Sequence, residues 1–291
     1  MIFYLYTDSR RLTPEVDPNA RQMMVTQGTF LEYLKIAGDK LGYQTTIHLF
    51  PEGDYNEQEL SESMKTKPAA KIILTKTNSQ NDPLYNFMFL PDTNREKYLP
   101  TRLTSGQIMK LENVNMDSDI SIKIFQDKKN TGKLNDYAMQ GADTEAGVNR
   151  VMTESENIFR SNEYQKNKYR YGFSMEGQGT SGIMMHLMQG LVTVFPSMNS
   201  GKASSDRFIQ STRTSVENTP AYAMIITGDN SRSSQVRSGM LYSKLILTAH
   251  QLGLTAQPLS QVLEEYPEMK NPYSSIHHDY APNGKTIQML F

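Results

Sequence analysis

The segment 231–254 reads SRSSQVRSGMLYSKLILTAHQLGL, and the segment 20–43 reads ARQMMVTQGTFLEYLKIAGDKLGY. The two align without gaps at an offset of 211 residues, and six of the 24 aligned positions are identical. Each segment follows an apolar stretch and an acidic turn, so each predicts a strand followed by a long helix. The identical pairs are Arg21 and Arg232, Val25 and Val236, Gly28 and Gly239, Leu34 and Leu245, Leu41 and Leu252, and Gly42 and Gly253.

The glycine in the middle of both predicted helices is the most informative of these identities. Glycine costs a helix about 1 kcal/mol relative to alanine. Gly28 and Gly239 in the same register therefore indicate a shared close-packing constraint, such as one helix crossing another. We expect two related halves in one chain, as in a fused pseudo-dimer. The alternative is that two amphipathic helices share leucine and glycine by chance.

Composition limits the class of protein around this repeat. The 291 residues carry 30 basic and 31 acidic side chains, a formal net charge of −1. This balance argues against a nucleic-acid binder, which needs a basic excess to neutralise phosphates. No apolar run reaches the roughly 18–20 residues of a membrane span, so we expect a cytoplasmic protein without a membrane partner. Cysteine is absent, which excludes disulfides and thiolate chemistry.

Local patterns predict a mixture of helices and strands without regular βαβ spacing, which favours the α+β class. The stretch 2–6 predicts a buried strand, 181–194 a buried helix, 136–160 one long surface helix, and the polar stretch 198–219 a flexible flap. Further strands are expected at 45–50, 69–75, 120–125, 222–227 and 287–291, and further helices at 19–41, 56–64, 103–111 and 233–252.

Short motifs for chemistry are weak. Gly177–Gly182 is a literal G-x-G-x-x-G, but the residues before it make a poor strand, so a turn before the next helix is favoured over a dinucleotide site. His277 and His278 would point to opposite faces of a strand, which disfavours a shared metal. We predict no metal site and no catalytic side chain, so a cofactor would supply any chemistry.

Three stretches resemble one known family. The run Ser233–Gln261 is similar to the C-terminal signature of the FMN-dependent nitroreductases, where a long helix ends at Gly-Leu and a loop passes the flavin. The opening YTDSRRLTPEVDPNARQMMVTQG resembles the Acg-type, internally duplicated branch. Thr93–Tyr98 (TNREKY) resembles the opening of that branch's second half. The resemblance implies central antiparallel sheets flanked by helices, with a first half at 1–90, N-terminally incomplete, and a second half at 91–291.

The same resemblance implies a set of FMN contacts. Asn94 and Arg95 would meet the ribityl-phosphate, and Pro258, Leu259, Ser260 and Gln261 would line the isoalloxazine ring through backbone N–H groups. The plainer alternative keeps Arg95 as a surface arginine and 258–261 as a turn. The sequence departs from the family where the range 89–91 (FLP) replaces a usual arginine, and where the N-terminal flavin-contacting element and the arginine after the last strand are absent.

The function implied is transfer of a hydride from NAD(P)H through FMN to a small electron acceptor such as a nitroaromatic or a quinone. An alternative is a protein that binds or sequesters flavin with little turnover. A third is a structural remnant without a cofactor. The chain is expected as a monomeric pseudo-dimer or as a homodimer.

Overall fold

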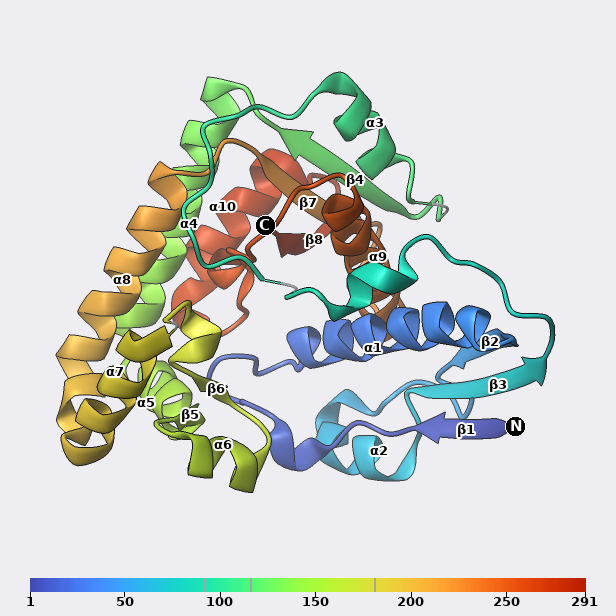
Figure 1. The fold of residues 1–291 in the computed structure, drawn as a ribbon, viewed down its shortest axis with the longest axis horizontal. Coiled ribbons are helices and arrows are strands. Elements are labelled where there is room, and N and C mark those ends of the chain that lie inside the picture. Colours follow the sequence, from blue (N-terminus) through green and yellow to red (C-terminus); the bar gives the residue numbers. More distant parts are fainter. Residues whose placement is uncertain (92, 116, 181) are drawn as a thin grey trace.

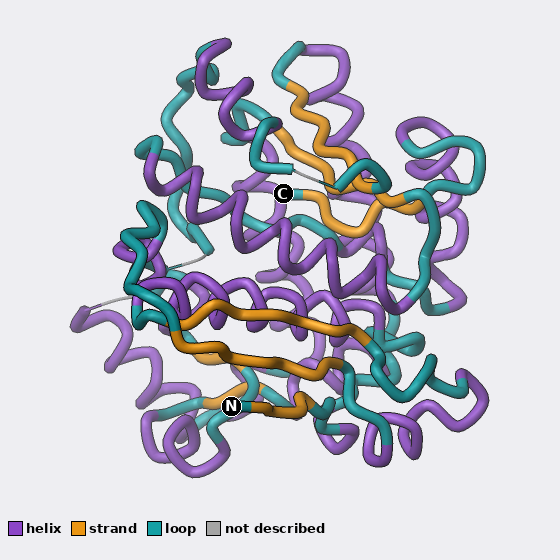
Figure 2. The backbone as a smooth tube through the Cα atoms, turned by 90° about the vertical axis from the view of Figure 1, so that its right-hand side faces the viewer, coloured by secondary structure: helices purple, strands orange, loops and turns teal. Residues whose placement is uncertain are grey.

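A computed structural model describes residues 1–91, 93–115, 117–180 and 182–291. The fold mixes helices with small sheets, as the α+β prediction requires (Figure 1). Two three-stranded antiparallel sheets form separate groups, and helices lie between them (Figure 2). A short parallel pair, β5 (Phe159–Arg160) and β6 (Phe173–Ser174), stands apart from both.

The first sheet has the order β1 (Ile2–Leu5), β3 (Ala70–Lys76), β2 (Tyr43–Leu49). Alternate residues of β2 are shielded and exposed, as expected for a sheet with one covered face. Helix α1 (Arg21–Lys40) packs on the covered face, where Ile72 joins a cluster with Met24 and Leu31. Helix α2 (Leu60–Thr66) adds Met64 to the same cluster.

The second sheet has the order β4 (Ile120–Phe125), β7 (Tyr222–Thr227), β8 (Thr286–Leu290). Its central strand β7 is shielded along its whole length because helices cover both faces. Ile225 packs with Leu245 on α9 (Arg232–Gln251). Met224 packs on the opposite side, with Leu134 on α4 (Lys128–Gly147) and Ile276 on α10 (Lys270–Tyr280).

The remaining elements are helices. The α-helices are α3 (Ser105–Glu112), α5 (Asn149–Asn157), α6 (Glu163–Tyr169), α7 (Gly182–Val194) and α8 (Gly201–Glu217). The 3-10 helices are η1 (Ser9–Arg11), η2 (Glu57–Glu59), η3 (Tyr85–Phe89), η4 (Glu176–Gln178), η5 (Pro196–Asn199), η6 (Gln261–Leu263) and η7 (Pro267–Met269).

Helices α1 and α9 cross at the two glycines of the repeat, which confirms the predicted close approach. A Cβ added to Gly28 would lie 1.9 Å from the carbonyl oxygen of Val236. A Cβ added to Gly239 would lie 1.8 Å from the carbonyl oxygen of Val25. Val25 and Val236 are counterparts at the offset of 211, as are Gly28 and Gly239, so each glycine meets the counterpart of the residue that the other meets.

The paired arginines Arg21 and Arg232 show the same exchange. Buried Arg21 donates to the carbonyl oxygens of Gln288 (2.6 Å) and Leu263 (3.0 Å), both in the C-terminal part of the chain. Arg232 donates to the carbonyl oxygen of Asn19 (2.6 Å) and to the carboxylate of Glu57 (2.5 and 2.9 Å) in the N-terminal part. Each arginine is thus held by the part of the chain that carries the other.

The element order around the two helices also corresponds. Along the chain, the strands of the first sheet and the α-helices between them come in the order β1, α1, β2, α2 and β3. The second has β7, α9, an extended stretch, α10 and β8. The N–H of Leu259 in that stretch donates to the carbonyl oxygen of Leu290 (2.9 Å), on the side of β8 away from β7. The stretch thus lies beside β8 as β2 lies beside β3.

Several predicted elements need correction. Strand β1, at the edge of the first sheet, is exposed over most of its length rather than buried, and among the described strands only β3 pairs with it. The expected helix at 136–160 starts earlier, at the N-cap Asp127, breaks at Val148 and packs inward rather than lying on the surface. The stretch expected as a flap contains α8, which packs against α4.

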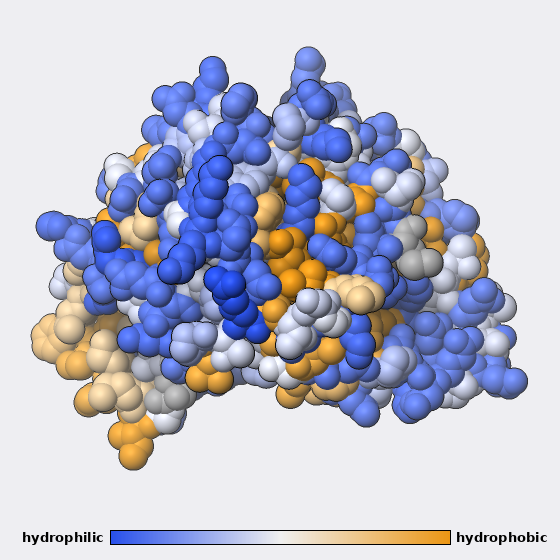
Figure 3. Space-filling model, turned by 90° about the horizontal axis from the view of Figure 1, so that it is seen from above, coloured by the Kyte–Doolittle hydropathy of each residue, from blue (hydrophilic) through white to orange (hydrophobic). Residues whose placement is uncertain are grey.

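Helix α7 was predicted to be buried, and the structure shows it exposed. It is apolar as expected, but it is exposed along most of its length. Ile183, Met184 and Leu187 each have more than half of their surface in solvent. Figure 3 shows this region as an apolar lobe at the lower left of the molecule. Ser181, the first residue of the predicted helix, lies outside the described residues.

Candidate functional site

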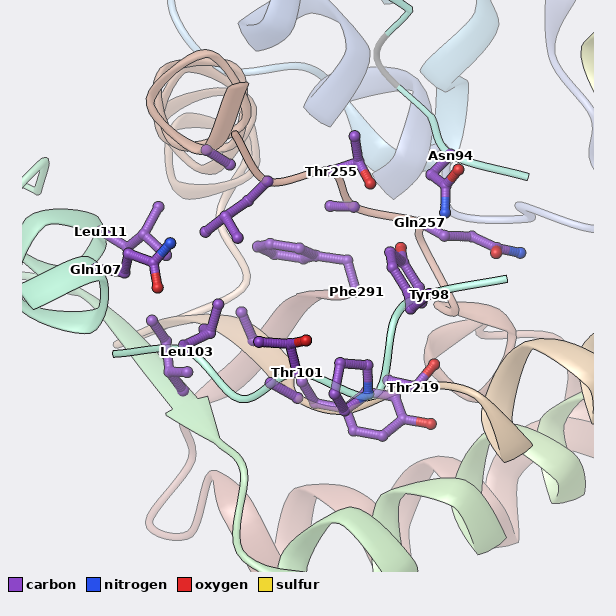
Figure 4. A pocket seen from close by; sticks show the side chains of 18 of the residues that line it. Asn94, Tyr98, Thr101, Leu103, Gln107, Leu111, Thr219, Thr255, Gln257 and Phe291 are labelled. Carbon is purple, nitrogen blue, oxygen red and sulfur yellow. The ribbon is translucent and has the colours of Figure 1, made fainter. Parts of the chain in front are cut away.

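A cavity of about 400 Å³ opens beside the second sheet (Figure 4). Its walls come from the loop before α3 together with the start of that helix, the start of β7, the end of α9 with the loop that follows it, and the C-terminal residue. The lining belongs to the ranges 94–111, 219–223 and 245–259, with Ile124 and Phe291. A volume of this size is within the range of about 300–1,000 Å³ that is usual for small-molecule sites.

Two loops far apart in the sequence are tied together at the mouth of the cavity. The backbone N–H of Asn94 donates to the carbonyl oxygen of Ala256 (2.8 Å). The side chain of Asn94 closes a local turn, accepting from the N–H of Glu96 (3.1 Å) and donating to the carbonyl oxygen of Glu96 (2.7 Å). The Asn94 side chain therefore shapes the loop, and its amide is already used.

The loop then runs along the cavity and enters α3 through a defined cap. Thr104 and Gln107 form a capping box, in which each side chain bonds to the backbone of the other residue. The side chain of Gln126 donates to the carbonyl oxygen of Leu103 (3.3 Å) and ties the loop to the end of β4. These bonds hold the lining residues between Asn94 and Gln107 in place.

Aromatic rings form much of the inner surface. The ring of Phe291 extends across the middle of the cavity, with Tyr98 to one side (Figure 4). Phe291 is held by backbone bonds to Ala223 (2.7 and 3.1 Å) and by an edge-on contact with Tyr242, with 5.1 Å between ring centroids. The hydroxyl of buried Tyr222 donates to Asn135 (2.6 Å). Burial raises the pKa of Tyr98 and of Tyr222, so both phenols stay neutral near pH 7.

The charged side chains at the cavity are cations. Among the described residues that line it, Lys97 and Arg102 are the only charged ones. Arg95, which follows Asn94 in the chain, is exposed and is not a lining residue, and no described residue forms an ion pair with it. Loss of water lowers the pKa of Arg95, and the phenols of Tyr242 and Tyr98 oppose that shift. Lysine and arginine stay charged near pH 7, so the lining, with Lys97 and Arg102, favours an anionic group.

The G-x-G-x-x-G stretch packs against Arg95 in the folded chain. Gly179 has a φ of +89°, and a Cβ there would lie 2.7 Å from the Cβ of Arg95. The stretch forms a turn around η4, as predicted, although its Ser181 lies outside the described residues. The glycine is therefore required by a turn and by close packing.

Only one of the four residues expected to contact the isoalloxazine ring lies in the cavity wall. Leu259 lines the cavity, whereas Pro258, Ser260 and Gln261 are not among the lining residues. The hydroxyl of Ser260 donates to the carbonyl oxygen of Leu290 (2.9 Å) and accepts from its N–H (3.1 Å). The N–H of Leu259 is also used by Leu290, and proline has no N–H. These groups join the stretch to β8 rather than facing the cavity.

Residues that the sequence did not single out make up most of the lining. Lys97 and Tyr98 belong to the stretch Thr93–Tyr98 that the sequence did single out, and Arg102 follows four residues later. The mixture of cations and an aromatic ring in this run was therefore a usable signal. The ranges 219–223 and 253–257 carried no such signal, because only the folded chain brings them together.

The two adjacent histidines lie in α10 and not in a strand. His277 uses both ring nitrogens within the fold, at 2.8 Å from the carbonyl oxygen of Tyr273 and 3.0 Å from the N–H of Ile287. His278 is exposed. Neighbouring positions on a helix are about 100° apart, so the two imidazoles do not converge.

Comparison with known proteins adds no relative. A scan against protein-family models found no match to the chain, and a search among curated proteins found none either. Within the described ranges, no helix combines the length and apolar character that crossing a membrane requires.

Proposed function

We propose that the chain is an FMN-dependent oxidoreductase of the nitroreductase type, built from two related halves at 1–90 and 91–291. The flavin would occupy the cavity between the loop after Asn94 and the loop after α9. The observation that carries this proposal is the bond from the N–H of Asn94 to Ala256. It joins, at the cavity wall, the two stretches whose sequences separately resemble flavin-contacting segments of that family.

Reciprocal contacts support the duplication. In a symmetric pair, residue i of one copy contacts j of the other, and j contacts i. The crossing at Gly28 and Gly239 and the exchange of Arg21 and Arg232 follow this rule at the offset of 211. The corresponding order of strands and helices around α1 and α9 supports it independently. A chance likeness between two helices explains none of these contacts.

The residues at the cavity fit a planar anionic cofactor. Tyr98 and Phe291 offer ring surfaces for a flat aromatic system. Lys97 and Arg102, with Arg95 beside them, supply positive charge for a phosphate, and a guanidinium can bind two phosphate oxygens at once. The expected contacts from 258–261 are replaced in this proposal by the loop 253–257, which lines the cavity.

FMN, when bound, would supply hydride transfer from NAD(P)H to a nitroaromatic or quinone acceptor. The chain's own contribution would be binding, orientation and exclusion of water. Phe291 and Tyr222 would offer apolar surface to the ring system, and Lys97 and Arg102 would hold the anionic group.

A second candidate function is flavin binding with little turnover. Its support is the cavity volume of about 400 Å³, which lies near the lower end of the range for a single ligand. A bound flavin would leave little room for a second ring to stack on it. Steady-state oxidation of NAD(P)H with a quinone acceptor separates the two functions, because only the reductase turns over rapidly.

The test is a comparison of FMN with riboflavin, which lacks the phosphate. Arg102→Gln is expected to weaken FMN binding about 10-fold to 100-fold, since a hydrogen bond to a charged group contributes about 1.5–3 kcal/mol. Riboflavin binding should stay unchanged. Fluorescence quenching of each flavin on titration with protein measures both.

Lys110→Gln is the matched control, because Lys110 is an exposed cation on α3 that does not line the cavity. It should leave both affinities at the wild-type level. A purified protein that shows no flavin absorbance and takes up no added FMN would overturn the proposal. That result would favour a structural role without a cofactor.

A further inference from the structure

The outer edge of β1 carries unused backbone groups. The N–H of Met1 donates to the carbonyl oxygen of Leu74 (2.8 Å), and the N–H of Leu74 donates back to Met1 (2.9 Å). Hydrogen-bonded pairs alternate in an antiparallel ladder. The N–H and carbonyl groups of Ile2 and Tyr4 therefore point away from β3. Within the described part of the chain, β1 pairs with β3 alone.

The side chains of this edge are apolar and unusually accessible. Ile2 and Phe3 have 57% and 48% of their surface in solvent, and Tyr4 has 49%. Natural edge strands are usually protected by charge, proline, a bulge or a cover. The strand IFYL has none of these within it. Figure 1 shows it at the margin of the first sheet, on the side away from β2.

In the second sheet, the edge that corresponds to the free edge of β1 is occupied by another strand. Strands β1 and β7 correspond, because each precedes one of the crossing helices and pairs antiparallel with the last strand of its sheet. On its other edge β7 carries β4, which pairs antiparallel with it over six residues, 120–125. The same position beside β1 is filled by no described strand.

We propose that this edge binds the β1 strand of a second copy of the chain. Two identical strands related by a twofold axis run antiparallel, which is the direction that β4 takes beside β7. Ile2 of one copy pairs with Tyr4 of the other, and the two Phe3 rings lie opposite each other as a cross-strand pair. An uncharged strand meets its own copy without repulsion. The two sheets then join into one continuous sheet.

The strength of this association follows from its size. Strand β1 has four residues, so the contact is small. Interfaces that bury less than about 1,200 Å² are typical of weak association. Interfaces of about 1,600 Å² bind with Kd values from micromolar to picomolar. For this smaller contact we therefore expect monomer and dimer to exchange, with the dimer accumulating as the protein concentration rises from about 1 to about 100 µM. This inference does not rest on flavin binding.

Two variants at one position test the edge directly. Tyr4→Pro removes an N–H that points outward and leaves the bonds to β3 in place, and proline is tolerated on edge strands. Tyr4→Thr removes the same ring and keeps the N–H and a high strand propensity. Sedimentation velocity should show a concentration-dependent dimer for the wild type and for Tyr4→Thr. Tyr4→Pro should stay monomeric, with the circular dichroism spectrum of the wild type.

Hydrogen exchange on the wild type provides a second readout. The amides of Ile2 and Tyr4 should exchange freely at low concentration and become protected as the dimer forms. A wild type that stays monomeric over this range overturns the proposal. So does a dimer that Tyr4→Pro leaves intact. Protection of these amides in a monomer would assign the edge to another segment, and would also overturn it.

Discussion

The two crossing glycines are the residues at which the packing of this molecule has least freedom. The atoms that a Cβ would meet are backbone oxygens, which cannot turn away as a side chain can. Gly239→Ala therefore forces α1 and α9 apart. We expect a loss of about 2 kcal/mol in the free energy of unfolding, measured in urea, because overpacking usually costs about 1–3 kcal/mol.

Gly132→Ala is the control for this prediction. Gly132 also lies within a helix, α4, but a Cβ there would meet nothing within 4 Å. Alanine should leave stability unchanged or raise it by up to about 1 kcal/mol through helix propensity. If Gly239→Ala behaved like Gly132→Ala, the two helices would not be in the close contact described above.

Within the elements, His277 links α10 to β8 through its neutral form. The ring nitrogen Nδ1 donates to the carbonyl oxygen of Tyr273, so Nε2 is free to accept from the N–H of Ile287. A proton on Nε2 would remove that acceptor. Burial lowers the pKa of His277 below its ordinary value of 6.5, and the bond to Tyr273 opposes the shift.

The pH dependence follows from the direction of this shift. The unfolded chain binds a proton at His277 more readily than the folded chain does. Stability from this group is therefore complete above about pH 6.5 and falls as the pH drops toward the folded pKa, by at most about 1.4 kcal/mol per pH unit. Urea unfolding of the wild type and of His277→Gln at pH 7 and pH 5 isolates this contribution: between pH 7 and pH 5 the wild type should lose stability relative to His277→Gln. Relative to His278→Gln, at an exposed neighbour, it should not.

Elements whose signal is local could be predicted from the sequence. The bounds 120–125 and 222–227 agree with the structure, because turn residues flank runs of strand-forming side chains. Burial could not be predicted in the same way. Helix α7 and strand β1 are apolar but exposed, since burial depends on what packs against an element and not on its composition. Helix α8 is polar yet ordered, because α4 accepts its narrow apolar face.

At the scale of the whole molecule, some features of the candidate site could be predicted from local sequence, and others depend on how distant segments pack together. The repeat predicted the crossing of α1 and α9 because both glycines are visible in one alignment. Of the residues expected to contact FMN, Asn94 and Leu259 line the cavity, and their contact with a flavin stays a prediction. The ring of Phe291 and the loop 253–257 could not be anticipated, because the cavity forms only where separate segments meet. Ser260 was expected to line the isoalloxazine ring, but it is not among the lining residues, and its hydroxyl bonds to Leu290 of β8.

Two buried carboxyl groups lie where the N-terminal and C-terminal parts of the molecule meet. Glu145 on α4 and Glu264 after η6 are each more than nine-tenths shielded from solvent. Burial raises the pKa of Glu145 from its ordinary 4.5 to about 7. Burial raises the pKa of Glu264 as well, and the nearby charge of Glu145 adds to that shift. From the N-terminal part, Arg21 lowers the pKa of Glu264 and Asp17 raises it.

These raised pKa values predict a loss of stability on the alkaline side. The folded chain holds protons at this pair that the unfolded chain releases above about pH 4.5. The stability they contribute is therefore complete below that pH and is lost as the pH rises through about 7. The contribution of this pair to the free energy of unfolding should fall between pH 5 and pH 8, opposite in direction to the contribution of His277.

Glu145→Gln tests this prediction, because it keeps the shape of the protonated acid and cannot ionise. Its free energy of unfolding should vary less between pH 5 and pH 8 than that of the wild type, and the difference should be largest at pH 8. Glu217→Gln, at an exposed position on α8, should keep the wild-type dependence. An equal slope in Glu145→Gln and the wild type would mean that Glu145 is already ionised in the folded chain at pH 5. The junction between the two parts would then tolerate charge, contrary to its burial.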